Sequence, residues 1–206
     1  MRKGAGRRVG LMGGSFNPPH EGHRQISLFA LQRLQLSEIW WLVTPGNPLK
    51  DHSELAEYDA RLDATRSMAR HPRIKISDFE RREGIVYTAQ TIDALRAQHA
   101  DLAFVWIMGA DNLAGFHRWE SWRAIMRSVP IAVLDRPGYR YKALASPAAT
   151  AFASSRIDES DAGILASLAP PAWAFLSGPL NPVSSTMLRR NNPVSHSISV
   201  AGAAHG

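Results

Sequence analysis

The stretch RRVGLMGGSFNPPHEGH, residues 7–23, joins a predicted strand to a predicted helix through a glycine-rich turn. Residues 7–13 contain a short apolar run and predict a buried strand. Apolar side chains at helical spacing then predict a helix from His20 to about Leu36. A strand that leads directly into a helix is the first half of a parallel α/β unit, so this stretch indicates the fold class.

The rest of the chain continues the alternation of strands and helices. We predict further strands at 38–44, 73–77, 102–108, within 130–138, and at 172–178. We predict further helices at 53–70, 88–99, 119–128 and 185–192, with a loop through Gly84 before the helix at 88–99. This order predicts an α/β fold, a Rossmann-like doubly wound parallel sheet whose strands all end at one edge.

The helix predicted at 53–70 has a recognisable start and an apolar stripe. Ser53 is a plausible N-cap, and the inner face should carry Leu55, Tyr58, Leu62 and Met68.

The size and composition of the chain suit one domain in a reducing compartment. The 206 residues contain no cysteine, which excludes a thiolate nucleophile and a cysteine-based zinc site. No apolar run approaches the roughly 20 residues that a membrane span needs. We expect a single cytoplasmic domain over 7–192, a flexible C-terminal tail over 193–206, and no membrane partner.

The chain is basic, with 24 lysine and arginine residues against 18 acidic residues and a formal net charge of +6. Basic proteins often bind phosphate, either in nucleic acids or in small polyanions. The basic clusters are short and lack the interleaved aromatic residues of a single-strand binding surface. We therefore expect a small phosphate-containing ligand and no nucleic acid.

The turn after the first predicted strand has the features of a phosphate site. Its glycine pair lets the backbone approach a ligand, and the helix N-terminus that follows favours an anion. His20 and His23 share one face of the first helical turn, where protonated or donating imidazoles would complete a cradle for phosphate. The spacing fits neither a Walker A loop, nor GxGxxG, nor the HExxH zinc motif. The alternative is an N-cap histidine beside a surface histidine.

These residues also carry a resemblance to a known family. GGSFNPPHEGH resembles the GxFxPxHxGH signature of the nucleotidylyltransferase superfamily, related to the HIGH motif of class I aminoacyl-tRNA synthetases, and SSTMLR at 184–189 resembles its ISSTxxR motif. NPLKDH, YTAQTIDALR and FVWIMGADNLAGFHRWESW, which lie between them, are similar to bacterial nicotinate mononucleotide adenylyltransferases. The resemblance covers about residues 7–192 and implies the nucleotidyltransferase fold.

The resemblance implies a reaction of NAD biosynthesis. That family transfers AMP from ATP to nicotinic acid mononucleotide, giving deamido-NAD and pyrophosphate. The mononucleotide phosphate attacks the α-phosphorus in line, so catalysis is mostly positioning and charge stabilisation. Mg²⁺ should arrive with ATP and keep most of its water, without a dedicated protein metal site.

The resemblance also implies the residues on the ATP side. The catalytic residues would be His20, His23 and Arg189, which stabilise charge on the phosphates. The same three residues would bind ATP together with Gly14, Ser15, Gly109, Asp111, Ser185 and Thr186. For Asp111, which would accept hydrogen bonds from the ribose, the alternative is an N-cap of the next helix.

On the acceptor side, the resemblance places Trp119 on the pyridine ring, with backbone N–H groups near Thr88 and Glu120 receiving the carboxylate. Asn47, Lys50 and Arg136 could meet the acceptor phosphate, and the alternative for the two cations is solvated surface charge. The loop TPGNPLKDH departs from the more usual PxNxPPH pattern, which affects the first two of these residues. We expect Trp122 to pack in the core.

Other functions remain compatible with the sequence. The acceptor could be nicotinamide mononucleotide or phosphopantetheine, or the chain could be a non-catalytic nucleotide or nucleic-acid binding protein. The sequence carries no signal for a particular oligomeric state.

Overall fold

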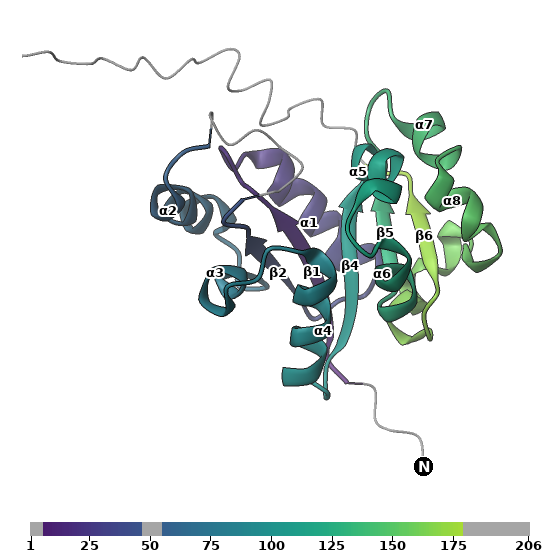
Figure 1. Ribbon diagram of the computed structural model, residues 1–206, viewed down its shortest axis with the longest axis horizontal. Helices are drawn as coiled ribbons and strands as arrows, with labels where there is room; N and C mark the ends of the chain where they lie inside the picture. Colours follow the sequence, from purple (N-terminus) through teal and green to yellow (C-terminus); the bar gives the residue numbers. More distant parts are fainter. Residues whose placement is uncertain (1–5, 47–54, 179–206) are drawn as a thin grey trace, which may run out of the picture.

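The computed structural model describes residues 6–46 and 55–178, and its centre is a parallel sheet (Figure 1). Six strands pair in the order β3-β2-β1-β4-β5-β6, and every pair is parallel. The strands are β1 (Arg8–Gly14), β2 (Glu38–Val43), β3 (Ile74–Ser77), β4 (Ala103–Gly109), β5 (Ile131–Leu134) and β6 (Trp173–Leu176). This strand order confirms the predicted doubly wound fold, in which strands are added outward from β1 on one side and outward from β4 on the other.

Helices cover both faces of the sheet. The α-helices are α1 (Glu21–Arg33), α2 (Tyr58–Ala69), α3 (Phe79–Glu83), α4 (Thr88–Gln98), α5 (Ala110–Gly115), α6 (Trp122–Ser128), α7 (Arg140–Leu144) and α8 (Pro147–Ala151). The described residues also form three 3₁₀ helices, which are η1 (Phe116–Arg118), η2 (Ala153–Ser155) and η3 (Glu159–Ser167). One core contains residues of α4, α5, α6 and α8, and the other contains residues of α1, α2 and η3.

The strand β4 shows why its sequence is a continuous apolar run. Phe104, Trp106 and Met108 point into the first core, whereas Val105 and Ile107 point into the second. A strand with helices on both faces has no polar side, so apolar residues occupy every position. Within the described residues, no helix has the length and apolar character needed to cross a membrane.

The helix predicted at 53–70 was partly wrong. Ser53 lies outside the described residues, and α2 begins at Tyr58, after Glu57 as its N-cap. Its buried residues are Arg61, Leu62, Thr65 and Ala69, whereas the predicted inner residues Leu55, Tyr58 and Met68 are only half-buried. The apolar pattern failed because an arginine and a threonine are buried here through hydrogen bonds to backbone carbonyls.

Other boundaries also differ from the prediction. The expected loop through Gly84 contains the short helix α3, which ends where Gly84 takes a left-handed conformation with φ 65°. The helix predicted from residue 119 begins at Trp122, because Ser121 before it also has a positive φ of 54°. The predicted helix at 185–192 and tail at 193–206 lie outside the described residues.

Candidate active site

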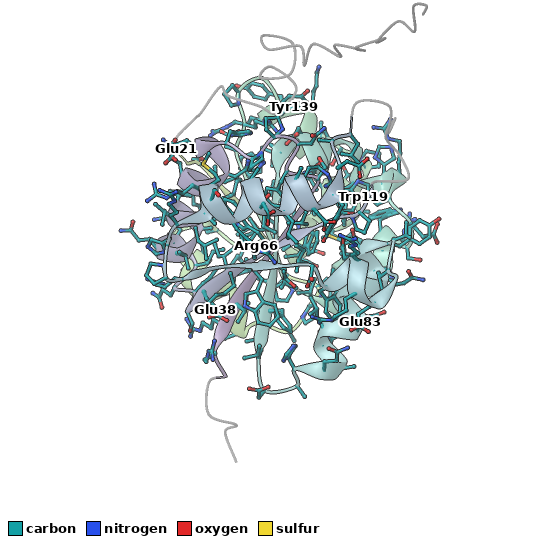
Figure 2. The ribbon with its side chains drawn as sticks, turned by 90° about the vertical axis from the view of Figure 1, so that its left-hand side faces the viewer. Glu21, Glu38, Arg66, Glu83, Trp119 and Tyr139 are labelled. Atoms are coloured by element: carbon teal, nitrogen blue, oxygen red, sulfur yellow. The ribbon has the colours of Figure 1, made fainter. Side chains whose placement is uncertain are left out.

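The predicted ATP and acceptor residues that the structure describes include three groups at the carboxyl ends of neighbouring strands. His20 and His23 follow β1, Asp111 follows β4, and Arg136 follows β5. Figure 2 shows Glu21, Tyr139 and Trp119 in the upper part of the molecule, where the strands end, and Glu38, at the start of β2, in the lower part. The topology therefore brings distant parts of the sequence to one edge of the sheet.

The two histidines lie against each other at the start of α1. His20 is the N-cap residue, and its backbone N–H donates to Nδ1 of His23 at 3.2 Å. The two ring centroids are 3.9 Å apart. The His23 ring also packs against Phe16 at 5.0 Å, and Phe16 stacks on Trp41 at 5.0 Å. Aromatic packing and the capping hydrogen bond thus fix the orientation of His23.

The buried hydroxyl group of Ser27 also holds the first turn of α1 in place. Ser27 Oγ donates to the carbonyl oxygen of His23 at 2.8 Å and accepts from Trp41 Nε1 at 2.8 Å. This network joins β2 to the first turn of α1, so His23 is held through its backbone as well as its ring.

Both histidines are neutral at pH 7. Burial, with the nearby charge of Arg136, lowers the pKa of His20 from 6.5 to about 4. Burial, with the charges of His20 and Arg136, lowers the pKa of His23 from 6.5 to about 3. Because Nδ1 of His23 accepts a hydrogen bond, its proton resides on Nε2. Of the two forms considered from the sequence, the structure therefore favours neutral imidazoles that donate hydrogen bonds.

His20 has unused hydrogen-bonding capacity. Its Nδ1 is buried and has no hydrogen-bond partner among residues 6–46 and 55–178. A buried polar atom without a partner costs free energy unless a ligand or water satisfies it.

Gly14 and Ser15 lie at the end of β1, beside the end of β2. The carbonyl oxygen of Gly14 accepts from the Thr44 N–H at 3.0 Å, and that of Ser15 accepts from Arg61 Nη1 at 2.7 Å. Both residues are half-buried. The backbone at this turn is therefore tied to the neighbouring strand and to α2.

Asp111 and Arg136, predicted for different substrates, form an ion pair. Arg136 Nη1 donates to Asp111 Oδ2 at 2.6 Å, and the two side chains are 32% and 26% exposed. Asp111 Oδ1 is buried and has no partner in the described part of the chain. The alternative role of Asp111 as an N-cap was wrong, because Gly109 is the N-cap of α5 and Asp111 lies inside the helix.

Gly109 is needed for space as well as for its place at the end of β4. A Cβ atom at this position would lie 2.4 Å from Oδ1 of Asp111. The glycine therefore leaves room for the Asp111 carboxylate to fold back over the start of α5.

A second acidic residue orients Arg136 through its backbone. Asp135 Oδ1 accepts from the Arg136 N–H at 2.8 Å, and Asp135 Oδ2 accepts from Arg140 Nε at 2.8 Å. Arg140 Nη2 also donates to Ser177 Oγ at 2.9 Å. These contacts join the ends of β5 and β6 and keep Arg136 at the edge of the sheet.

Three of the predicted acceptor residues, Thr88, Trp119 and Glu120, lie at or near helices α4 and α6. Trp119 is half-buried, with its ring edge-on to Phe116 at 5.2 Å. Trp122 is only 8% exposed and packs in the first core, which confirms the core assignment. Thr88 begins α4 and is half-buried, whereas Glu120 is exposed. Trp119 is thus partly exposed and partly packed against the first core.

The remaining predicted site residues, Asn47, Lys50, Ser185, Thr186 and Arg189, lie outside the described residues. Among the residues that are described, no group of three or more histidine, aspartate and glutamate side chains could hold a metal ion.

Sequence reasoning missed two buried charged residues near these loops. Arg61 of α2 contacts the loops after β1 and β2. Glu80 of α3 accepts a hydrogen bond from Thr91 Oγ1 at 2.9 Å, and burial raises the pKa of its carboxyl group. No sequence pattern indicates either residue, since both lie among ordinary charged residues of the chain.

Comparison with known proteins adds a family to this geometry. A family model described as cytidylyltransferase-like matches residues 11–191. A Rhizobium meliloti (strain 1021) protein named probable nicotinate-nucleotide adenylyltransferase is 54% identical over 181 residues, covering 88% of this chain and 96% of the relative. A protein of the same name from Bradyrhizobium sp. (strain BTAi1) is 58% identical over 182 residues, covering 88% of this chain and 95% of the relative.

A solved structure has the same fold. It is that of the Plasmodium falciparum nicotinic acid mononucleotide adenylyltransferase complexed with NaAD. It matches with a TM-score of 0.67 at 16% identity, covering 89% of this chain and 83% of that chain.

Proposed function

The chain belongs to the nicotinate-nucleotide adenylyltransferases of the cytidylyltransferase-like family, and from that premise we propose which of its residues act on each substrate. The enzyme transfers AMP from ATP to nicotinic acid mononucleotide in NAD biosynthesis. An oxygen of the mononucleotide phosphate forms a bond to the α-phosphorus of ATP. The bond from that phosphorus to the oxygen bridging to the β-phosphorus breaks, and pyrophosphate leaves with the electron pair.

We propose that His20 and His23 hold the phosphates of ATP as neutral donors. The observation that carries this proposal is the hydrogen bond from the His20 N–H to His23 Nδ1, which leaves the Nε2 proton of His23 free to donate. A donor that is already oriented needs no rearrangement when charge develops on the phosphate in the transition state. The N-terminus of α1 adds the partial positive charge of its free N–H groups. Gly14 and Ser15 would add backbone and hydroxyl contacts.

On the nucleoside side, Asp111 would accept hydrogen bonds from the ATP ribose, and Gly109 would let the ligand approach the end of β4. Arg136 would then exchange its contact with Asp111 for the acceptor phosphate. This exchange is plausible chemically because a guanidinium binds a phosphate with the same forked geometry that it uses for a carboxylate.

The other roles rest on the family resemblance. Ser185, Thr186 and Arg189 would hold the β- and γ-phosphates of ATP. Trp119 would stack on the pyridine ring, with Thr88 and Glu120 offering backbone N–H groups to its carboxylate. Asn47 and Lys50 would contact the acceptor phosphate.

Mg²⁺ would enter bound to ATP and neutralise part of the phosphate charge. The donor set around the histidines is nitrogen-rich and includes a cationic arginine, which fits a metal held by substrate and water. We further propose that the reaction takes place in the cytoplasm.

The decisive test is a chromatographic product assay. The purified protein would receive Mg-ATP with nicotinic acid mononucleotide, nicotinamide mononucleotide or phosphopantetheine in separate reactions. A dinucleotide formed mainly from the first acceptor supports the proposal. A preference for the second acceptor would overturn the assignment of the pocket at Thr88 and Trp119. No product from any acceptor, in a folded protein that binds ATP, would point to a nucleotide-binding protein without catalysis.

A further inference from the structure

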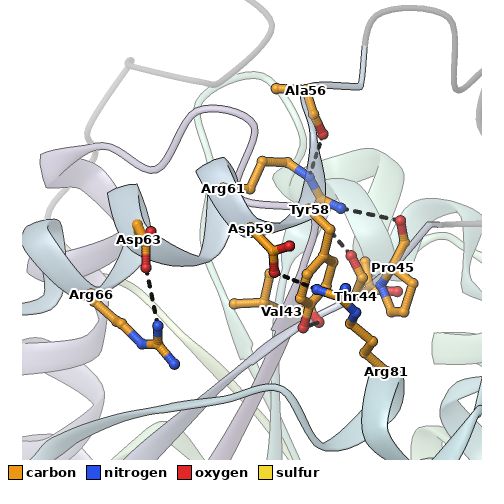
Figure 3. Close-up of polar contacts among 10 residues, drawn as sticks. All are labelled: Val43, Thr44, Pro45, Ala56, Tyr58, Asp59, Arg61, Asp63, Arg66 and Arg81. Carbon is orange, nitrogen blue, oxygen red and sulfur yellow. Dashed lines mark hydrogen bonds and ion pairs between the residues drawn. The ribbon is translucent and has the colours of Figure 1, made fainter.

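Arg61 is a buried cation to which neither the motifs nor the proposed reaction assigns a role. It lies in the first turn of α2 and is only 3% exposed. Its guanidinium donates to four backbone carbonyls, which Figure 3 draws except for that of Ser15. Nε donates to Ala56 at 2.9 Å, Nη1 to Ser15 at 2.7 Å and Thr44 at 2.9 Å, and Nη2 to Pro45 at 3.1 Å.

The hydrogen-bond acceptors of Arg61 are neutral carbonyl oxygens, in contrast to the carboxylates that pair with Arg66 and Arg81 of the same region. Within the described part of the chain, no carboxylate lies within ion-pair distance of Arg61, whereas Arg66 pairs with Asp63 and Arg81 with Asp59 (Figure 3). A buried charge requires compensation, and here carbonyl dipoles supply it. The cation therefore depends on the placement of these loops, and the loops depend on the cation.

Three of the four carbonyls belong to two loops that leave the sheet side by side, and the fourth, that of Ala56, lies just before α2. Ser15 follows β1, and Thr44 and Pro45 follow β2. The strand ends themselves are joined by the Thr44 N–H, which donates to the Gly14 carbonyl at 3.0 Å. Beyond that last ladder bond, Arg61 crosslinks the two loops. Its planar fork fixes the distance between them in a way that a flexible ammonium would not.

A second contact from the same segment reaches the phosphate turn. The Ala56 N–H donates to Oδ1 of Asn17 at 3.3 Å, while the Ala56 carbonyl accepts from Arg61. Residues 56–61 thus touch the turn at both Ser15 and Asn17, immediately before His20.

We propose that Arg61 is a positioning residue for adenylyl transfer, which holds the phosphate turn in register with the loop after β2. This inference rests on the proposed function. Because Ser15 and the histidines would bind ATP, a shift of their turn moves the α-phosphorus relative to the attacking phosphate. A misplacement of about 1 Å can slow an enzymatic reaction by about 100-fold.

The test compares Arg61→Lys and Arg61→Met with Arg66→Ala, a matched control on an exposed face of α2. Each variant is assayed for its melting temperature, its kcat, and its KM for ATP and for nicotinic acid mononucleotide. In folded Arg61→Lys we expect kcat to fall about 100-fold, with a raised KM for ATP, because the charge remains but the fork is lost. Arg66→Ala should match the wild type in all four quantities.

A purely structural role would give a different pattern. Activity would then fall only in proportion to the folded fraction, with kcat per folded molecule and both KM values unchanged, and this result would overturn the proposal. If neither Arg61 variant folds, the test instead follows the NMR resonance of the Arg61 Nε–H group in the wild-type protein. Addition of α,β-methylene ATP should shift this resonance and leave that of Arg66 in place; an unmoved Arg61 resonance would refute the role.

The proposed function and the positioning role of Arg61 can be refuted independently of each other. A wild-type protein that forms no dinucleotide contradicts the proposed function. The resonance shift with α,β-methylene ATP still reports whether Arg61 is linked to the phosphate turn.

Discussion

At the scale of single residues, His20 and His23 obtain their properties from packing. Burial and the charge of Arg136 keep both imidazoles neutral, and the capping hydrogen bond selects the tautomer of His23. A neutral donor can hold a phosphate without requiring acid, so the site does not depend on a histidine pKa near 7. The function of these residues then depends on hydrogen-bond geometry.

The first prediction separates the capping and donor roles of His23. In His23→Asn, the side-chain amide oxygen occupies the place of Nδ1 and keeps the cap, but the Nε2 donor is lost. We expect kcat to fall by about 100- to 1000-fold, the usual effect of removing one donor to a developing oxyanion. The melting temperature should change little. Steady-state kinetics and calorimetry test this, and a variant with wild-type kcat would exclude His23 from catalysis.

The second prediction concerns the pH dependence of stability. The pKa of each histidine is lower in the folded protein, about 4 and about 3, than the value of 6.5 for the unfolded chain. As the pH falls below 6.5, the unfolded state therefore takes up protons first, and the free energy of unfolding decreases. Urea unfolding between pH 7 and pH 4.5 should show this loss. The double variant His20→Asn/His23→Asn should show a flatter dependence, and an equal slope in both proteins would contradict the assignment.

The sequence revealed some of these residues and concealed others. The histidines could be predicted because a strand, a glycine pair and a helix start lie together in one short stretch. The pairing of Asp111 with Arg136 joins residues 25 apart, and Arg61 contacts Ser15 from 46 residues away. A local sequence pattern carries no information on contacts between residues that are far apart in the chain, so these two interactions could be found only in the structure.

At the scale of elements, the short helix α5 brings the carboxylate of Asp111 back over its own N-terminus. Its Oδ1, which is buried and has no partner among residues 6–46 and 55–178, faces the space above Gly109. The N-terminus of a helix favours a carboxylate nearby, which suits this placement of the Asp111 side chain.

The third prediction tests this arrangement with Gly109→Ala. The new Cβ would meet Asp111 Oδ1 at 2.4 Å, so the carboxylate must move away from its pair with Arg136. We expect a KM for ATP raised about tenfold, equivalent to about 1.4 kcal/mol of lost binding, with a small change in melting temperature. Gly115→Ala, at the other end of α5, is the control because its Cβ meets only the flexible end of Arg118. Equal kinetics in both variants would refute the ribose role of Asp111.

The fourth prediction compares Trp119, which precedes α6, with Trp122, the first residue of that helix. Trp122→Ala should reduce the free energy of unfolding by about 3–5 kcal/mol, because its ring fills the core between Phe116 and Phe152. Trp119→Ala should instead raise the KM for nicotinic acid mononucleotide several-fold, since an aromatic stacking pair is worth about 0.5–1.5 kcal/mol. Denaturant titration and kinetics on both variants test this. A large stability loss at Trp119 with unchanged KM would place it in the core instead.

Element boundaries were predicted less well than element types. An inner strand such as β4 was found because a parallel strand with two covered faces is apolar throughout, whereas the edge strand β3 was found because its residues alternate. The start of α2 was missed because Ser53 resembles an N-cap, whereas the helix forms only from Tyr58, where Arg61 reaches its carbonyl partners. Tertiary hydrogen bonds, which have no local signature, decided that boundary.

At the scale of the whole molecule, the strand order places the candidate site residues on both sides of the point between β1 and β4. The turn after β1 lies on one side of this point, and the loops after β4 and β5 lie on the other. Arg136 acts across this division, since its charge lowers the pKa of both histidines after β1. The edge of the sheet thus carries the positive charges of Arg136 and of a helix N-terminus, balanced in part by Asp111, while its imidazoles are neutral.

The fifth prediction follows from these positive charges and from the net charge of +6. Both substrates are anions, so their encounter with the enzyme should weaken as salt screens the field over a Debye length of about 10 Å at 0.1 M and about 3 Å at 1 M. We expect kcat/KM for both substrates to fall about tenfold between these two concentrations, at the lower end of steering effects on association. The value of kcat at saturating substrate should change little, because the bound phosphates contact their donors directly. Sucrose at matched osmolality is the control for non-ionic effects.

The same salt series with added RNA distinguishes a phosphate-substrate site from a nucleic-acid binding surface. A nucleic-acid binding protein would bind RNA with a steep salt dependence and form no dinucleotide. A flat kcat/KM across the series would mean that the positive charge lies away from the path of the substrates.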